Sequence, residues 1–358
     1  MKANDKRLTD EINRLLQEIE TFIVQMFSAA LGIHSVKKAL REGNVFWFSR
    51  NSTANNQINS ILADFNKNVN AVFLTSIAKS QILGQEKHFF NMRSLLSKRP
   101  QQLRYFEEIT KRTTEQTRNI GSLQSAQRFM NMKKAGRTLS DRVWNLSGNA
   151  KKEIEVIIQN GIIQGKSADE LSKNLRKYLK EPDKLFRRVK NKETGELEWS
   201  KAAKQFNPGQ GVYRSSYQNA MRLARTEITS AYRLAQWEAM QKDPQITGIR
   251  IQLSNNHTLN GKPFVDICDD LQGVYPKTFM WQGWHPQCRC VMTPVLVGGE
   301  DFRAMVDAEI IGEEYEPQQI NEMPENFNEW LSENSERLQN AKQLPFWLED
   351  NNIKMLFS

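Results

Sequence analysis

The feature that most constrains the fold of this chain is the helical spacing of apolar residues in its N-terminal part. Apolar side chains recur at intervals of three, four and one from Leu8 to Phe27, and a second such series runs from Ile58 to Ile77. This spacing places them along one face of an α-helix, and such a face is normally buried against another element. We therefore expect residues 1–138 to form a helical region.

Further helices are predicted from residue 139 onward. Ser140 is positioned to cap a short helix that includes Trp144, and residues 147–163 form a second predicted helix. Ser167 and Glu170 have the S-x-x-E spacing of a capping box and precede another apolar series, so a third helix should begin there. A polar insertion over 184–204 contains the sequence NKETGELEW, which favours a hairpin.

The segment after residue 212 combines a long helix with short strands. Residues 213–241 have an apolar stripe from Tyr217 to Trp237, and we assign four charged residues to the opposite, exposed side: Arg222, Arg225, Glu227 and Arg233. Apolar and polar residues then alternate over 249–253, which predicts a half-buried strand. A second short strand is expected over 289–293, ended by Pro294.

These patterns predict a predominantly helical α+β protein with three segments. A helical, basic N-terminal region covers 1–138. A helix-rich domain with a small β-sheet and a Cys/His loop covers 139–300. An acidic, proline-containing tail with one amphipathic helix around residues 327–338 covers 301–358.

The charge of the chain is distributed unevenly. The whole chain has a formal net charge of +9, but residues 1–250 have 43 basic and 24 acidic residues, whereas residues 301–358 have 4 and 13. A basic body can contact a polyanion such as DNA through its phosphates, without reading the base sequence. A solvated, lysine-rich helical surface would give the same composition, so charge alone leaves both interpretations open.

Composition also limits the protein class. Three cysteines in 358 residues are too few for a disulfide-stapled secreted scaffold, which favours a reducing compartment. The longest apolar stretch is interrupted by polar residues and is shorter than the roughly 20 residues that cross a bilayer. The first 14 residues contain no apolar segment of the kind found in secretory signals. We expect no membrane association.

All three cysteines fall within one 23-residue window that also contains a histidine. Cys268, His285, Cys288 and Cys290 together make a set of one imidazole and three thiolates, which is typical of a closed, structural Zn²⁺ site. The surrounding loop is poor in apolar residues, so a metal could supply the stability that packing does not. His257 and Asp266 are alternative ligands. Three reduced cysteines without metal, or a disulfide from Cys268 to either of the others, also fit the sequence.

The order of motifs resembles that of the Mu F-like minor head proteins of tailed phages, also called head-morphogenesis proteins. Arg225-Thr226-Glu227 lie on the long helix, and Asp266–Asp269 (DICD), Gly273–Pro276 (GVYP) and His285–Cys290 (HPQCRC) follow the strand. The match covers roughly residues 140–296. Family members often have a C-x-x-C motif at this place, whereas this chain has Cys268 but Leu271 at the position of the second cysteine. Because that cysteine is missing, a metal would need His257 or His285 as a ligand.

The resemblance implies a non-enzymatic, low-copy virion protein of a phage or prophage. Such a protein associates with the portal and with capsid or scaffold proteins during assembly in the host cytoplasm. It stays inside the head and helps the genome to enter or leave, where nonspecific contact with double-stranded DNA would suit the basic body. We also expect Arg225 and Glu227 to make structural pairs outside their helix, possible partners being in the Cys/His loop.

An enzyme is the alternative of a different class. A zinc-dependent nuclease could use His257 and His285, although the expected neighbouring Asp, Asn or His ligands are only loosely present. The zinc-deaminase signature is absent from the sequence, and the remaining 58 residues after the head-protein segment are too few for a typical catalytic domain.

Overall fold

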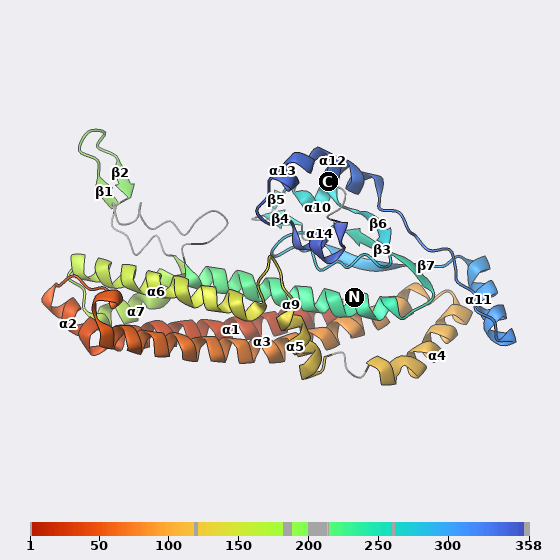
Figure 1. Ribbon diagram of the computed structural model, residues 1–358, viewed down its shortest axis with the longest axis horizontal. Helices are drawn as coiled ribbons and strands as arrows, with labels where there is room; N and C mark the ends of the chain where they lie inside the picture. Colours follow the sequence, from red (N-terminus) through yellow and green to blue (C-terminus); the bar gives the residue numbers. More distant parts are fainter. Residues whose placement is uncertain are drawn as a thin grey trace. The chain divides into compact units, whose positions relative to one another are not determined.

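The computed structural model describes residues 2–117, 121–181, 188–199, 213, 215–255, 257–259 and 262–353. The described chain is mostly helical, with a small antiparallel sheet in its C-terminal part (Figure 1). This confirms the predicted α+β, predominantly helical class.

The longer helices are α1 (Lys2–Gly32), α2 (His34–Glu42), α3 (Ser52–Leu95), α4 (Pro100–Thr117), α5 (Leu123–Asn131), α6 (Leu139–Ile163), α7 (Ala168–Lys180), α9 (Ser216–Gln241) and α11 (Gly299–Ile311). The shorter ones are the 3₁₀ turn η1 (Phe48–Arg50), α10 (Ile267–Asp270), α12 (Glu325–Glu333), α13 (Ser335–Gln339) and α14 (Phe346–Asp350). Among these helices, none is long and apolar enough to span a bilayer by itself. Only α1 and α2 taken together have enough length and apolar content, and the two helices are bent by 65° relative to each other.

The strands form three small antiparallel sheets. They are β1 (Arg188–Lys190), β2 (Leu197–Trp199), β3 (Ile246–Gln252), β4 (Thr258–Leu259), β5 (Lys262–Pro263), β6 (Gly273–Pro276) and β7 (Val291–Leu296). β1 pairs with β2 and β4 with β5, while β3 is the central strand of the order β6-β3-β7. The β1–β2 pair is the hairpin predicted within 184–204.

The chain divides into two compact units, each assembled from separate stretches of sequence. One unit contains residues 1–12, 75–136 and 225–358, and the other contains 13–74 and 137–224. The three predicted segments are continuous stretches of sequence, with boundaries at 138 and 300. Each observed unit instead combines stretches from before and after residue 138. We call the first the sheet unit and the second the helical unit.

Two helices of the helical unit, α6 and α7, begin with a capping box. Thr138 and Asp141 form a capping box at the start of α6, and Ser167 and Glu170 form the predicted one at the start of α7. The predicted break between residues 144 and 147 is wrong, because α6 continues without interruption through this region. Buried side chains at helical spacing along α6 provide the packing that keeps it continuous.

The sheet unit has an edge strand that tolerates a proline. β7 begins at Val291 and extends to Leu296, so the prediction that Pro294 ends it is wrong. Pro294 lies opposite Ile249 of β3, and β7 is at the edge of the sheet. A proline has no N–H to donate, and an edge strand needs hydrogen bonds on only one side.

The acidic C-terminal segment contributes to the core of the sheet unit. The predicted amphipathic helix around 327–338 is divided into α12 and α13, which meet at Asn334. Phe327, Trp347 and Leu348 are fully or almost fully buried and belong to the same apolar cluster as the sheet residues. The segment is therefore acidic on its surface but folded through its aromatic residues.

Candidate metal centre

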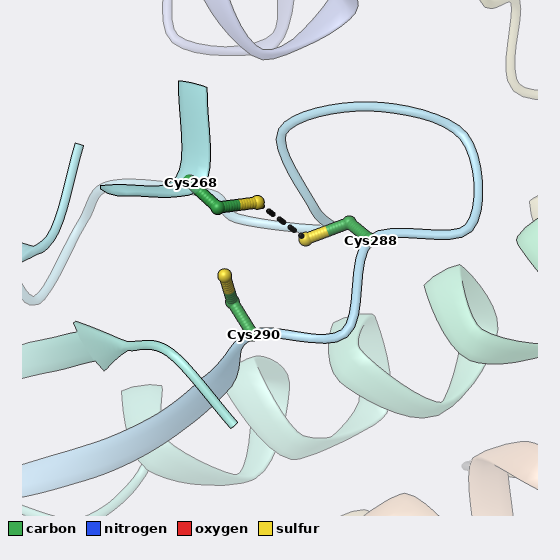
Figure 2. A group of neighbouring side chains, drawn as sticks. All are labelled: Cys268, Cys288 and Cys290. Carbon is green, nitrogen blue, oxygen red and sulfur yellow. Dashed lines mark hydrogen bonds between the residues drawn. The ribbon is translucent and has the colours of Figure 1, made fainter. Parts of the chain in front are cut away.

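Three thiols converge inside the sheet unit. Cys268 is in the short helix α10, and Cys288 and Cys290 lie on the segment that leads into β7. Their Sγ atoms all lie within 4.8 Å of one another, with 3.7 Å between those of Cys268 and Cys288, and all three side chains are buried (Figure 2). This cluster can hold a metal ion.

The cysteines are all free thiols. A disulfide needs sulfur atoms about 2.05 Å apart, so the 3.7 Å separation of Cys268 and Cys288 is a contact between thiols. Of the alternatives that the sequence allowed, the structure therefore leaves free thiols and metal ligands.

The local backbone explains why these thiols meet. Asp266 caps α10, because its Oδ1 accepts a hydrogen bond of 2.8 Å from the backbone N–H of Cys268. The N–H of Cys288 donates to the carbonyl of His285 at 3.1 Å and closes a turn. Gly283, which precedes this turn, has a φ of +129°, and a Cβ there would lie 2.6 Å from Arg233 Nη1. Glycine is therefore required at position 283.

His285 lies beside the thiols and faces them with one nitrogen. Its Nε2 is 3.0 Å from Cys268 Sγ and 3.2 Å from Asp266 Oδ2. Its Nδ1 is 2.8 Å from the carbonyl oxygen of Pro286, which accepts a hydrogen bond when Nδ1 carries the proton. That tautomer leaves the Nε2 lone pair available for a metal. His285, Cys268 and Asp266 form a second group of donor atoms that shares Cys268 with the thiol group.

The alternative ligand His257 is separated from the thiols by two carboxylates. Its Nε2 is 3.1 Å from Asp269 Oδ2 and 3.6 Å from Asp266 Oδ1. These three residues make a third group, which shares Asp266 with the second. The structure thus brings all six predicted site residues into one neighbourhood, but His257 contacts carboxylates and not the thiol group.

A buried arginine of α9, predicted to lie on the exposed side of that helix, fixes this loop. Arg233 is 6% exposed, and its guanidinium donates to the carbonyl oxygens of Gln282 (3.1 Å), Cys288 (2.8 Å) and Cys290 (2.7 Å). It also stacks 4.6 Å from the ring centre of Trp281. Glu227, Ser230 and Gln236 of the same helix are also polar and buried, so polarity at helical spacing gave no signal for the burial of Arg233.

Arg225 and Glu227 occupy different environments. Glu227 is buried and pairs with Lys134 Nζ at 3.4 Å, which is a structural pair outside the Cys/His loop. Arg225 is exposed. The contact with the loop comes from the residue between them, since Thr226 Oγ1 accepts a hydrogen bond of 3.2 Å from the backbone N–H of Gln287.

The thiols differ in acidity because they hydrogen-bond to one another. The pKa of Cys288 lies well below its usual value, because Cys268 and Cys290 donate to its sulfur and the positive charge of Arg233 is nearby. The pKa of Cys268 is raised by its hydrogen bond to Cys288. A metal cation bound at the cluster would displace the thiol protons.

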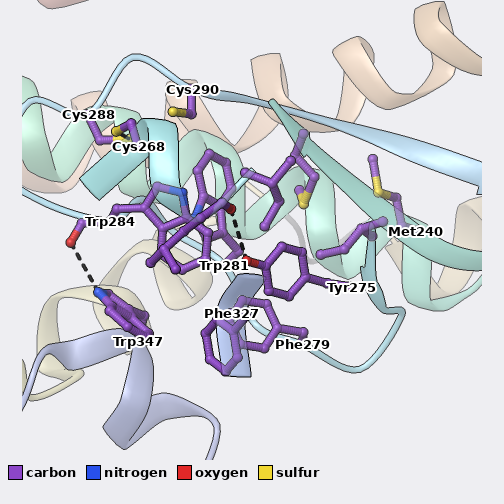
Figure 3. Packing of buried hydrophobic residues seen from close by; sticks show 14 of the residues in the cluster. Met240, Cys268, Tyr275, Phe279, Trp281, Trp284, Cys288, Cys290, Phe327 and Trp347 are labelled. Atoms are coloured by element: carbon purple, nitrogen blue, oxygen red, sulfur yellow. Dashed lines mark hydrogen bonds between the residues drawn. The ribbon is translucent and has the colours of Figure 1, made fainter. Parts of the chain in front are cut away.

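An aromatic core surrounds the thiols on one side. Trp281, Trp284 and Tyr275 belong to the same apolar cluster as the thiols, and Trp347 of α14 donates from its Nε1 to the carbonyl of Trp284 at 3.1 Å (Figure 3). The centre is thus tied to the C-terminal helices as well as to α9.

Comparisons with known proteins identify no relative: no family model, no curated protein and no solved structure matches the chain. The residues and their geometry are therefore the basis for assigning a function.

Proposed function

We propose that this chain is a structural, non-catalytic minor head protein of a tailed phage, with a Zn²⁺ ion at the thiol cluster. The observation that carries the proposal is the contact between the two motifs on which the family resemblance depends. The 225–227 triplet meets the 285–290 motif through the hydrogen bond from Gln287 to Thr226. Motif residues separated by about 60 positions therefore belong to one local structure.

The geometry of the thiols supports zinc. In a tetrahedral site with Zn–S bonds of about 2.3 Å, two sulfur atoms lie about 3.8 Å apart. The distance between Cys268 and Cys288 is 3.7 Å. His285 would be the fourth ligand through Nε2, which lies 3.0 Å from Cys268 Sγ.

The burial of the thiols favours a structural role over catalysis. The side chains of Cys268, Cys288 and Cys290 are 0%, 5% and 2% exposed. A catalytic metal keeps one position open to substrate, whereas three thiolates and an imidazole close the coordination shell. Such a site would join α10 to the segment that leads into β7 and would add to the apolar packing of the loop between β3 and β7.

The charge distribution supports contact with packaged DNA. Residues 1–250 contain 43 basic and 24 acidic residues, and lysine or arginine contacts to phosphates do not require a base-reading motif. The partners that follow from the proposal are the portal, capsid or scaffold proteins and double-stranded DNA. The place of action is the interior of the virion, after assembly in the host cytoplasm.

The metal content of protein purified without a histidine tag tests the zinc proposal. We expect about one zinc per chain by elemental analysis, strongly reduced in Cys288→Ser and in His285→Ala. His34→Ala is the matched control, because His34 is an exposed histidine of α2 far from the cysteines in sequence. Zinc near zero in the wild-type protein would refute the assignment.

Three assays test the head-protein proposal. Mass spectrometry of purified particles should detect the chain inside the capsid, and its absence from particles would refute the proposal. Co-expression with the portal should allow the full chain to retain the portal on an affinity column.

Gel-shift titration should show DNA binding that weakens at least about tenfold between about 50 and 200 mM salt. Metal-dependent cleavage of plasmid, lost in Cys288→Ser, would instead support the nuclease alternative.

A further inference from the structure

A row of metal-binding side chains continues beyond the thiols. Asp266 lies between two imidazoles, with Oδ2 at 3.2 Å from His285 Nε2 and Oδ1 at 3.6 Å from His257 Nε2. Asp269 Oδ2 is 3.1 Å from the same nitrogen of His257. The donor atoms of His257, Asp266 and Asp269 all lie within 4.8 Å of one another.

The backbone of α10 fixes the two carboxylates. Asp266 Oδ1 accepts from the N–H of Cys268 at 2.8 Å, and Asp269 Oδ2 accepts from the N–H of Asp266 at 2.9 Å. These bonds hold both side chains at the start of α10 and direct them toward His257. The same helix carries Cys268, so the carboxylates and the thiol group are positioned by one short element.

His257 is held in place by stacking. Its ring lies 4.3 Å from that of Phe264, with an angle of 24° between the planes. The side chain is 10% exposed, and its Nε2 faces the two carboxylates. A buried imidazole with a fixed orientation loses little conformational entropy when it binds a cation.

The charge of this group calls for a cation. Two carboxylates, 25% and 26% exposed, face a histidine that is neutral unless protonated. Within the described part of the chain, their ion pairs are with histidines and not with lysine or arginine. Bringing two such charges together is unfavourable without a compensating positive charge.

We propose that His257, Asp266 and Asp269 form a second divalent-cation site next to the thiol cluster, with Asp266 lying between the two. Its donor set of one imidazole and two carboxylates is harder than three thiolates. It therefore suits a metal such as Mn²⁺, with water completing the coordination shell. We call the site formed by His257, Asp266 and Asp269 the outer site. It goes beyond the proposed function and does not require that the thiol cluster contain zinc.

The chain offers a matched set of variants. His257→Ala removes the imidazole, and Asp269→Asn removes one charge while keeping an oxygen that can accept the capping hydrogen bond. Asp270→Asn is the control, because Asp270 is the next residue of α10, is exposed, and lies outside the three donor groups.

Mn²⁺ titration followed by electron paramagnetic resonance measures the site directly in the full chain as purified. We expect one saturable Mn²⁺ per wild-type chain. The Kd should rise at least about tenfold in His257→Ala and in Asp269→Asn, and stay within twofold of wild type in Asp270→Asn. If Asp269→Asn does not fold, as judged by circular dichroism, His257→Ala decides the question.

Either of two results would overturn the proposal: no saturable Mn²⁺ binding by the wild-type chain, or equal loss of binding in His257→Ala and Asp270→Asn. Zinc measured in the same samples separates this outcome from failure of the thiol site. Zinc retained without Mn²⁺ binding rejects only the outer site, whereas Mn²⁺ binding without zinc rejects only the zinc assignment.

Discussion

Replacing Arg233 should strongly destabilise the sheet unit. The guanidinium donates to three backbone carbonyls of the Cys/His loop and stacks on Trp281. In Arg233→Met the apolar stem is roughly preserved. The three carbonyls lose their charged donor while they remain buried.

The size of the effect can be estimated from these contacts. A hydrogen bond from a charged donor contributes about 1.5 kcal/mol, so three contribute about 4.5 kcal/mol. Stacking of the guanidinium on an indole adds about 1 kcal/mol. Methionine avoids the cost of burying a charge, which we take as about 2 kcal/mol. The expected net loss in the free energy of unfolding is therefore about 3.5 kcal/mol.

Urea unfolding followed by tryptophan fluorescence measures this loss. Five of the eight tryptophans belong to the sheet unit and would dominate the signal: Trp237, Trp281, Trp284, Trp330 and Trp347. Arg225→Met is the matched control, because Arg225 is exposed on the same helix and its replacement should change stability by less than about 0.5 kcal/mol. If Arg233→Met differed from Arg225→Met by less than about 1 kcal/mol, the role that we assign to Arg233 would be wrong.

Three further predictions concern packing and pH, each measured by urea unfolding. In α6, Gly148→Ala should stabilise by about 0.5–1 kcal/mol because its Cβ meets open space, whereas Gly161→Ala should destabilise by about 1–2 kcal/mol because its Cβ would lie 2.6 Å from a Leu171 methyl. Burial raises the pKa of Glu153 from 4.5 to about 7, although its carboxylate accepts from the N–H of Ser216. Between pH 4.5 and about 7 the folded state therefore binds a proton at Glu153 that the unfolded state has lost. The free energy of unfolding should fall by about 3 kcal/mol as the pH rises through this range, and Glu153→Gln should remove that dependence. Trp347→Ala should cost about 3–5 kcal/mol, because the side chain is fully buried.

Much of the local structure follows from local sequence patterns. The capping box at Ser167 and Glu170, the hairpin within 184–204 and the strand near residue 249 depend on residues close in sequence, and all three are present. The grouping of all three cysteines with His285 in one 23-residue window also predicted a common neighbourhood, because one imidazole and three thiolates make a zinc ligand set.

Features that depend on distant residues were not predictable in the same way. Arg233 is polar, so helical periodicity alone assigns it to solvent; its burial depends on carbonyls about 50–57 residues later in the chain. Pro294 ends a strand by propensity, but the edge position of β7 makes it harmless. The burial of Trp347 depends on Trp284, 63 residues earlier, and no local pattern in the acidic segment indicates that partner.

The discontinuous make-up of the sheet unit has a consequence for the order in which it can form during translation. The thiols are synthesised before α12 and α14, whose aromatic residues complete the surrounding core. At about 5–20 residues per second, that interval lasts roughly 3–12 s. During that interval the aromatic residues of α12 and α14 are absent, so the core around the thiols closes only when the end of the chain has been made.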